Sequence, residues 1–543
     1  MPPKTDRIPS LNGWSVLLLV LVGLLVLPLL AIGWRLTGGV GESWSHVREF
    51  YLPTYLSNSA ILLLGAGTLS TLLGLGCAWC VTQLSFRGRR LLEILLFLPL
   101  SIPSYLMAYA YVGLLGYGGS LTKISRWFGW EAPQIELMNH WGLIWVLGLS
   151  LFPYVYASCR AFLLRKGQRL RQAAQLLGAT GRTYFLRVAL PLTAPAIIGG
   201  LLLVGMEILN DYGAAKYFGI NTFTTGIFRT WTALEDLPSA TYLAAILVAL
   251  VLVLSLLARW LRGRRSYART EGEGKVTRQT LRGGWKVAVP ALLWLVVTVA
   301  LILPTGQFLY WGLLTLDRAD PTKLALLSAQ SIFLAGAAAL VTALVSVAIV
   351  FLNRWSKLRG LRSVSRLATV GYALPGAIIG IGIIGSSQAV INGVEAWFGL
   401  RIGYLFYASS VVLLYAYVFR FLAVAYYPLE ASSIRTGKQM GEAAALLGAS
   451  RLKSLWRVEL PLLRPAFISA LLLVFIDTLK ELPLTLILKP YDVETLATNA
   501  YAYADDEQVT LAAWPALLLI AAAAVLTVVV LRREQRQEAS ITK

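Results

Sequence analysis

The sequence predicts an all-α, polytopic membrane protein with about 12 transmembrane helices. Hydrophobic residues make up 57% of the 543 residues, and charged residues only 14%. The mean hydropathy is +0.68. Apolar runs of about 18 residues or more, long enough to cross a bilayer, recur from one end of the chain to the other. This composition argues against a disordered tail, a secreted disulfide scaffold and a nucleic-acid-binding protein.

The expected spans fall into two sets of six. The first run, Trp14–Trp34, is too long for a signal-peptide core, so we expect it to be retained as a span. A polar linker at 263–284, containing T-E-G-E-G-K, separates a first half, 1–262, from a second half, 285–543. The expected spans lie at roughly 14–34, 58–82, 91–115, 141–163, 191–213, 240–261, 286–312, 325–352, 367–386, 405–427, 461–487 and 508–531.

The basic residues indicate the orientation in the membrane. The formal net charge is +21. The loops on the side of both termini, with the adjoining span ends, hold 36 Lys and Arg against 9 acids, whereas the opposite loops hold 10 against 14. Because Lys and Arg are retained in cytoplasmic loops, we expect both termini to be cytoplasmic. The positive charge is therefore attributed to topology and not to an anionic ligand.

The two halves repeat one another. At a fixed offset of 270, 14 of the 30 positions in Arg171–Gly200 and Gly441–Ala470 are identical without a gap. Apolar composition alone would match Leu and Ala, but it would not align a Gly, an Arg and two Pro residues. Because six is an even number of spans, both copies keep the same orientation, which predicts two parallel, pseudo-symmetric six-helix halves. The matches include Ala173/Ala443, Ala174/Ala444, Gly178/Gly448, Arg187/Arg457, Pro191/Pro461 and Pro195/Pro465.

Each copy predicts a helix, a turn and a second short helix at the membrane face. Helix-forming residues lead into Gly178 or Gly448, and glycine commonly ends a helix in the left-handed conformation. Pro191 or Pro461 is then expected to open the next span, because proline is tolerated in a first helical turn. The alanines before each glycine permit close approach of another protein. A connector that packs on its own bundle is the alternative, but two copies favour two equivalent docking sites.

Both copies resemble the E-A-A-x3-G-x9-I-x-L-P signature of the membrane subunits of binding-protein-dependent ABC importers. The resemblance implies the type I permease fold and two loops that each seat in a cleft of a cytoplasmic ATPase. The first copy has Gln172 where the family usually has Glu, and Val188 and Val458 replace the usual Ile. The coupling residues that the resemblance implies are Gln172, Ala173, Ala174, Gly178, Pro191, Glu442, Ala443, Ala444, Gly448 and Pro461.

The stretches 209–231 and 477–498 resemble the fused permeases of bacterial ferric-iron importers, which carry both halves on one chain. Permeases for thiamine, sulfate, phosphonates and polyamines are close relatives and remain alternatives. The chain has no G-x-x-x-x-G-K-[ST] motif. The resemblance therefore implies a permease subunit of the inner membrane, not an enzyme, that binds no cofactor. Its partners would be membrane lipid, two copies of an ATPase that uses the ATP, and an extracytoplasmic binding protein.

Four acids lie inside apolar segments, where ionisable groups are costly and usually face a cavity or a partner. The offset of 270 superposes Glu207 on Asp477 and Asp211 on Glu481, so each half has two acids four residues apart. We expect each pair on one helical face near the outer end of its span, where four carboxylates would suit a hard cation. The alternative is pairing, for example of Asp477 with Lys480, or bonding to loop backbone.

Three further expectations follow from the sequence. Arg420 is expected to extend toward the cytoplasmic face. The chain has two His and three Cys without a cluster for a soft metal. Two parallel six-span halves also describe ion-coupled secondary transporters, in which the acids would carry protons and the loops would be mere connectors. The duplicated Gly/Pro loop favours the ATP-driven class.

Overall fold

The structure is a computed structural model. It describes residues 12–130, 135–176, 178, 181–262, 278–356, 360–404, 409–436, 440, 443–444 and 446–541.

The described part of the chain is built from membrane-length helices. Eleven helices are long and apolar enough to cross a bilayer, or up to 12 if the bent pair Arg89–Ser101 and Ser104–Trp127 forms one span. Two two-residue strands, β1 (Leu84–Ser85) and β2 (Gln279–Thr280), pair in parallel. The predicted all-α polytopic class is confirmed.

The chain groups into two compact units. Unit 1 contains Met1–Val40 and Ala325–Thr498, and unit 2 contains Gly41–Leu324 and Asn499–Lys543. This grouping by contact cuts across the predicted halves, because the first helix of the chain joins helices of the second half. The halves themselves, and the linker between them, stay a prediction about internal repetition. Most of that linker lies outside the described residues.

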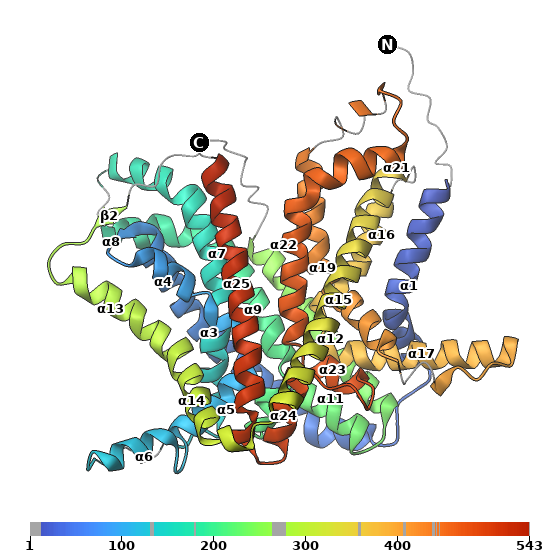
Figure 1. The fold of residues 1–543 in the computed structure, drawn as a ribbon, viewed down its shortest axis with the longest axis horizontal. Helices are drawn as coiled ribbons and strands as arrows, with labels where there is room; N and C mark the ends of the chain where they lie inside the picture. Colours follow the sequence, from blue (N-terminus) through green and yellow to red (C-terminus); the bar gives the residue numbers. More distant parts are fainter. Residues whose placement is uncertain are drawn as a thin grey trace. The chain divides into compact units, whose positions relative to one another are not determined.

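Unit 1 places the first helix of the chain beside helices of the second half. α1 packs against α16 and α17, and Figure 1 shows the blue α1 next to the yellow α16. Within the same unit, α19 packs against α22, and α17 against α23. The elements are α1 (Gly13–Leu36), α15 (Pro321–Trp355), α16 (Leu361–Ala368), η6 (Thr369–Ala373), α17 (Gly376–Phe398), α19 (Val411–Thr436), α21 (Arg451–Ser454), η7 (Leu455–Glu459), α22 (Leu460–Leu479) and α23 (Pro483–Leu488).

Unit 2 contains the remaining helices, and α24 begins just before its last segment. Those of the first half are α2 (Trp44–His46), η1 (Val47–Tyr51), α3 (Leu52–Gln83), α4 (Arg89–Leu95), η2 (Leu98–Ser101), α5 (Ser104–Leu115), α6 (Ser120–Trp127), α7 (His140–Leu176), α8 (Gly181–Thr183), η3 (Tyr184–Ala189), α9 (Leu190–Asn210), α10 (Gly213–Tyr217), α11 (Phe223–Thr232) and α12 (Leu237–Arg262). The others are α13 (Trp285–Val297), η4 (Thr298–Ile302), α14 (Leu303–Leu314), η5 (Leu316–Arg318), α24 (Leu496–Asp505), η8 (Val509–Ala512) and α25 (Ala513–Ile541).

Glycines let α3 and α9 approach α7 closely from two sides. A Cβ atom at Gly74 would lie 2.7 Å from Val155 Cβ and 2.8 Å from Phe152 O, and one at Gly200 would lie 2.7 Å from Val155 Cα. Small residues at helix contacts are typical of membrane proteins, where close backbone packing replaces the hydrophobic effect between helices. At the offset of 270, the residue of the second half that corresponds to Gly200 is also small, Ala470.

The third and ninth spans are broken, where the sequence predicted continuous helices. Ile102 and Leu374 have extended backbones, with φ −100° and ψ 108°, and φ −93° and ψ 134°. Each precedes a proline, Pro103 or Pro375, and the proline ring disfavours the helical conformation in the residue before it. The first break bends the chain by 97°. A side chain of the following span bonds each broken end, because Ser150 Oγ donates to Ile102 O at 3.1 Å and Arg420 Nη1 to Leu374 O at 3.2 Å.

Prolines also explain the π-helical turns. Among the described residues, η1, η3, η4 and η7 are each followed directly by a Leu-Pro pair, at Pro53, Pro191, Pro304 and Pro461. A proline inside a helix lacks an N–H and crowds the carbonyl one turn earlier. A wider turn relieves this clash and lets the helix continue. Long helices therefore pass through positions where the sequence predicted a helix start.

Asp236 caps the N-terminus of α12 and ties it to the segment before α2. Its carboxylate accepts bonds from Ser239 N at 2.9 Å, Ser239 Oγ at 2.7 Å and Ser43 N at 2.8 Å. Burial works against ionisation, but these hydrogen bonds outweigh it and lower the pKa of Asp236.

We expect Asp236→Ala to lower the free energy of unfolding by about 1 kcal/mol, the usual cost of a lost N-cap. The folded-state pKa lies below the value of about 3.9 in an unfolded chain. The ionic part of the stabilisation is therefore complete above that value and is lost as the pH falls through the folded-state pKa. Thermal unfolding in nanodiscs from pH 7 to pH 3 measures both effects. Asp236→Asn, which keeps an N-cap, should retain most of the stability and lose this pH dependence; an equal loss for Ala and Asn at pH 7 would contradict the cap.

Candidate functional site

The first repeated loop is an extension of two spanning helices. α7 runs beyond the membrane-length segment to Leu176, and Gly178 follows with φ +76°. The chain then enters α8, which continues through η3 into α9. The predicted left-handed termination at Gly178 is confirmed.

From its glycine onward, the second loop has the same form. Gly448 has φ +78°, and α21 continues through η7 into α22. The prediction that Pro191 and Pro461 open their spans is wrong, because each lies inside a helical run that begins earlier. The π-helical turn before each proline removes the clash that would have started a new helix there.

One face of the first loop packs on its own bundle. Ala174, Tyr184 and Ala189 form a buried cluster against Trp79 of α3. The rings of Trp79 and Phe185 meet edge to face with centroids 4.7 Å apart. Ala444, the counterpart of Ala174, is also buried. The close approach that these two alanines allow is therefore to the chain itself.

The other face of both loops exposes large apolar side chains. Leu176 is 89% exposed, and Leu446 and Leu447 are 90% and 89% exposed. Trp456 in η7 is also exposed. Large apolar residues that the described part of the chain leaves exposed form a surface suited to a protein partner.

The remaining predicted coupling residues are placed as follows. Ala443 is exposed, and Pro191 and Pro461 are exposed on α9 and α22. The backbones of Gln172 and Ala173 lie in α7, but their side chains are outside the described part. Glu442 lies outside the described residues.

An ion pair that the sequence analysis missed anchors the second loop. Arg354, near the end of α15, pairs with the buried carboxylate of Glu459 in η7. Ser454 Oγ donates to the same carboxylate at 3.3 Å. The repeat held a signal for this pair, because Glu459 stands where the first copy has Ala189.

The acid Asp211 caps a short helix in the first half. α9 ends at Asn210, and the buried Asp211 carboxylate accepts bonds from Ser104 Oγ and from Ala215 N of α10, the latter at 2.9 Å. Ser104 is the first residue after the break at Pro103. Asp211 therefore joins two interrupted spans through neutral hydrogen-bond donors.

The equivalent acid of the second half, Glu481, is ion-paired. Its carboxylate accepts a bond from Leu484 N at 3.0 Å and lies 3.2 Å from Arg420 Nε. A Cβ atom at Gly376 would lie 2.9 Å from Glu481 Oε1, so glycine leaves room for the carboxylate beside the second break. Arg420 is buried, and its predicted extension toward the cytoplasmic face is wrong. The acid and the carbonyl of Leu374 hold it inside the bundle.

The expectation that the two acids of each half share one helical face is also wrong. Glu207 lies within α9 and Asp477 within α22, but each helix ends before the second acid. The pairing drawn from the sequence as an alternative applies to Asp477, whose Oδ1 lies 3.6 Å from Lys480 Nζ. Asp211 and Glu481 accept bonds from backbone N–H groups of the short helices α10 and α23, where the alternative expected loop backbone. Among the described residues, no three His, Cys, Asp or Glu side chains are grouped to hold a metal ion.

The helices, the repeated loops and their exposed faces define a class of membrane transport subunit. The family model described as "Binding-protein-dependent transport system inner membrane component" matches residues 70–267. The chain belongs to this family, and it is a fused, two-half ABC permease of the inner membrane.

Individual known proteins are similar to this chain over different shares of its length. The chain is 26% identical over 519 residues to "Fe(3+)-transport system permease protein FbpB 2" of Haemophilus influenzae, covering 93% of this chain and 95% of the relative. It is 30% identical over 254 residues to "Sulfate transport system permease protein CysT" of Escherichia coli, covering 45% of this chain and 87% of the relative. A solved bacterial alginate ABC transporter, in complex with an alginate pentasaccharide-bound periplasmic protein, is 19% identical, with a TM-score of 0.38, covering 46% of this chain and 93% of that chain.

We expect Gly448→Asp to leave membrane insertion intact and to abolish transport. Nothing lies within 4 Å of the added Cβ, and a non-glycine residue in the left-handed region costs about 1–2 kcal/mol, which a large membrane protein tolerates. The added charge would stand on the exposed face of the loop. Substrate uptake and the amount of protein in the membrane are the two measurements.

Gly399→Asp is the matched control, because Gly399 also has a positive φ, +67°, and open space around it, but it lies at the end of α17. It should insert and transport. Normal uptake by Gly448→Asp, or equal loss in both variants, would contradict a coupling role for the loop.

We expect Arg420→Met to lower the free energy of unfolding by about 3–5 kcal/mol, because it leaves the buried carboxylate of Glu481 without its cation. The double variant Arg420→Met/Glu481→Gln should recover most of this loss. Arg401→Met is the control, because the Arg401–Glu395 pair at 3.3 Å is largely exposed. Its loss should lower the free energy of unfolding by no more than about 1 kcal/mol. Thermal unfolding in nanodiscs measures all three, and a double variant no more stable than Arg420→Met would refute the pairing.

Proposed function

We propose that this chain forms the whole translocation path of an ATP-driven importer, and that its cargo is ferric iron. In this proposal two copies of a cytoplasmic ATPase dock on residues 171–190 and 441–460, both termini are cytoplasmic, and an extracytoplasmic binding protein delivers the cargo. ATP-driven closure of the two ATPases would draw the loops together and move the helices that continue from them.

The shape of the two loops carries this proposal. Each loop has a left-handed glycine and continues into a spanning helix, α9 or α22. In each loop, leucine side chains are exposed and one alanine is buried. A force applied to such a loop would reach α9 or α22 directly, because no flexible joint intervenes between η3 and α9 or between η7 and α22. The repetition of this device in both halves supports two docking sites of one kind.

The similarity to a ferric permease over almost its whole length supports iron as the cargo. The four acids inside apolar segments do not all support ferric iron as the cargo to the same degree. Asp477 and Glu481 lie beside Lys480 and Arg420, so in the second half carboxylate charge is offset by cations. The groups that bond the Asp211 carboxylate are a hydroxyl and a backbone amide, which are neutral. Of the four candidates, Glu207, Asp211, Asp477 and Glu481, we therefore assign the path-lining role in the first place to Asp211, because carboxylate oxygens suit a hard cation.

Other cargoes remain the alternative. A sulfate permease and the molybdenum permease of Escherichia coli are similar to about one half of this chain or less. Buried cations such as Arg420 and Lys480 would favour an anion if they faced the path. Thiamine, phosphonates and polyamines are further candidates from the same resemblance.

Uptake of radiolabelled ferric iron by cells with and without this chain tests the proposal. Cellular ATP is held constant and a protonophore is present, so that an ion-coupled carrier stops while an ATP-driven importer continues. We expect deletion to abolish a protonophore-resistant uptake and Gly399→Asp to restore it when supplied on a plasmid.

The possible outcomes test the transport mechanism and the identity of the cargo separately. Uptake that stops with the protonophore in the wild type would overturn the ATP-driven mechanism and favour an ion-coupled transporter. Unchanged iron uptake after deletion, in cells without a second iron importer, would overturn the iron assignment and leave sulfate, molybdate, thiamine, phosphonates and polyamines to be measured in the same way.

A further inference from the structure

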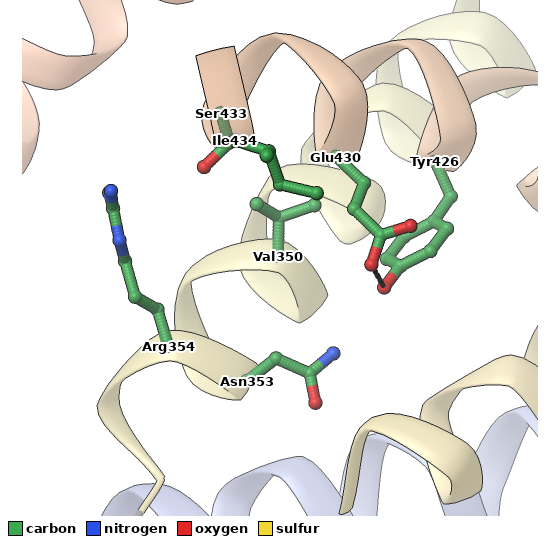
Figure 2. A pocket seen from close by; sticks show the side chains of 7 residues that line it. All are labelled: Val350, Asn353, Arg354, Tyr426, Glu430, Ser433 and Ile434. Carbon is green, nitrogen blue, oxygen red and sulfur yellow. Dashed lines mark hydrogen bonds between the residues drawn. The ribbon is translucent and has the colours of Figure 1, made fainter. Parts of the chain in front are cut away.

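A pocket of about 260 Å³ lies between the ends of α15 and α19, next to the second loop. It is lined by Val350, Asn353, Arg354, Tyr426, Glu430, Ser433 and Ile434. Figure 2 shows two polar sides separated by the apolar side chains of Val350 and Ile434, with Arg354 on one side and Glu430, Tyr426 and Asn353 on the other.

In the first half, charged side chains occupy the place that corresponds to this pocket. Arg160 stands at the position of Glu430, 270 residues earlier. Its Nε donates to Glu93 Oε1 at 2.8 Å, and Arg89 Nη1 donates to Glu93 Oε2 at 2.9 Å. α3 packs along α7 there, whereas α15 and α19 leave the pocket between them. The position that holds the basic Arg160 in the first half therefore holds the acidic Glu430 in the second half.

Two groups in the pocket lack the partners that their chemistry needs. Glu430 accepts one hydrogen bond, from Tyr426 OH at 3.1 Å, and forms no ion pair among the described side chains. Asn353 Oδ1 accepts a bond from Ser365 Oγ at 2.9 Å, but its buried Nδ2 has no acceptor in the described part of the chain. A buried donor without an acceptor is destabilising, so the pocket is suited to a ligand with one cationic group and one acceptor.

We propose that this pocket binds a small zwitterion, an aliphatic α-amino acid in size and chemistry. Its ammonium group would pair with Glu430, its carboxylate would accept the bond from Asn353 Nδ2, and its side chain would lie against Val350 and Ile434. The pocket is large enough for such a molecule and has apolar walls with a few convergent polar groups, as small-ligand sites do. The proposal does not depend on the identity of the transported cargo.

The position of the pocket gives the bound ligand an effect on the second loop. Arg354 lines the pocket and also holds Glu459 in η7. A ligand that joins α15 to α19 would restrict the motion of Arg354 and therefore of the loop that it anchors. Occupancy of the pocket should slow amide hydrogen exchange in residues 451–460.

The test uses the full-length permease in nanodiscs and three probes of the same carbon skeleton: leucine, 3-methylbutylamine, which lacks the carboxylate, and 4-methylpentanoate, which lacks the ammonium group. We expect leucine to raise the melting temperature in a concentration-dependent way. The amine should bind at least tenfold more weakly, and the acid should have no effect.

Three variants locate the site. Glu430→Gln and Asn353→Asp change one polar atom each and should weaken leucine binding at least tenfold, and Ile434→Trp should abolish it by filling the pocket. Glu395→Gln, a matched change of a half-exposed acid on α17, should leave it unchanged. If a polar variant does not fold, Ile434→Trp keeps the test intact.

The proposal is overturned if leucine causes no shift, or if the shift survives both Glu430→Gln and Ile434→Trp. Equal binding of leucine and 3-methylbutylamine would overturn the role of Asn353 and the zwitterionic class. Leucine binding that leaves exchange in 451–460 unchanged would overturn the link to the loop.

Discussion

Satisfaction of backbone hydrogen bonds inside the hydrocarbon layer is the constraint on which the rest of this structure depends. Prolines remove donors in several spans, and the chain compensates in two ways. Where the residue before the proline is forced into an extended conformation, at Pro103 and Pro375, the helix breaks and a side chain of the following span bonds the freed carbonyl. Where the helix must continue, at Pro191 and Pro461, a π-helical turn precedes the proline. The acids after α9 and α22 serve the same need, because they cap the short helices that follow.

The two halves meet this constraint with different chemistry. Ser150 and Arg420 occupy the same position of the repeat, and each bonds the carbonyl of the residue before the proline at a break. Only the arginine brings a charge, which Glu481 balances. Near the repeated loops it is the first half that carries the ion pairs, because Arg89 and Arg160 both pair with Glu93. The second half has a pocket beside Glu430 instead. The breaks and the turns before the prolines are therefore alike in the two halves, whereas the charged side chains beside them differ.

Hydrophobic runs and the repeat were enough to predict the helical class, the number of spans and the left-handed glycines at Gly178 and Gly448, because these follow from local composition and backbone geometry. The breaks could have been inferred from Ile102–Pro103 and Leu374–Pro375, but a proline preceded by an apolar residue also occurs where the helix continues, as at Pro191. The pairs Arg354–Glu459 and Arg420–Glu481 join residues more than 60 positions apart. No periodicity or local propensity identifies such partners, which depend on which helices pack together.

The placement of α1 has a consequence for the order of events during synthesis. α1 is made first, yet the helices it packs against belong to a segment of unit 1 that begins only at Ala325. At about 5–20 residues per second, ribosomes need on the order of 15–60 s to make the intervening chain. During that interval α1 must stay in the bilayer without its protein neighbours. Its hydropathy, 3.0 over its most apolar window, is the highest among the spanning helices of the described chain, and even in the finished fold only 28% of that window is buried. A helix whose neighbours are made so long after it is thus also well suited to be surrounded by lipid alone.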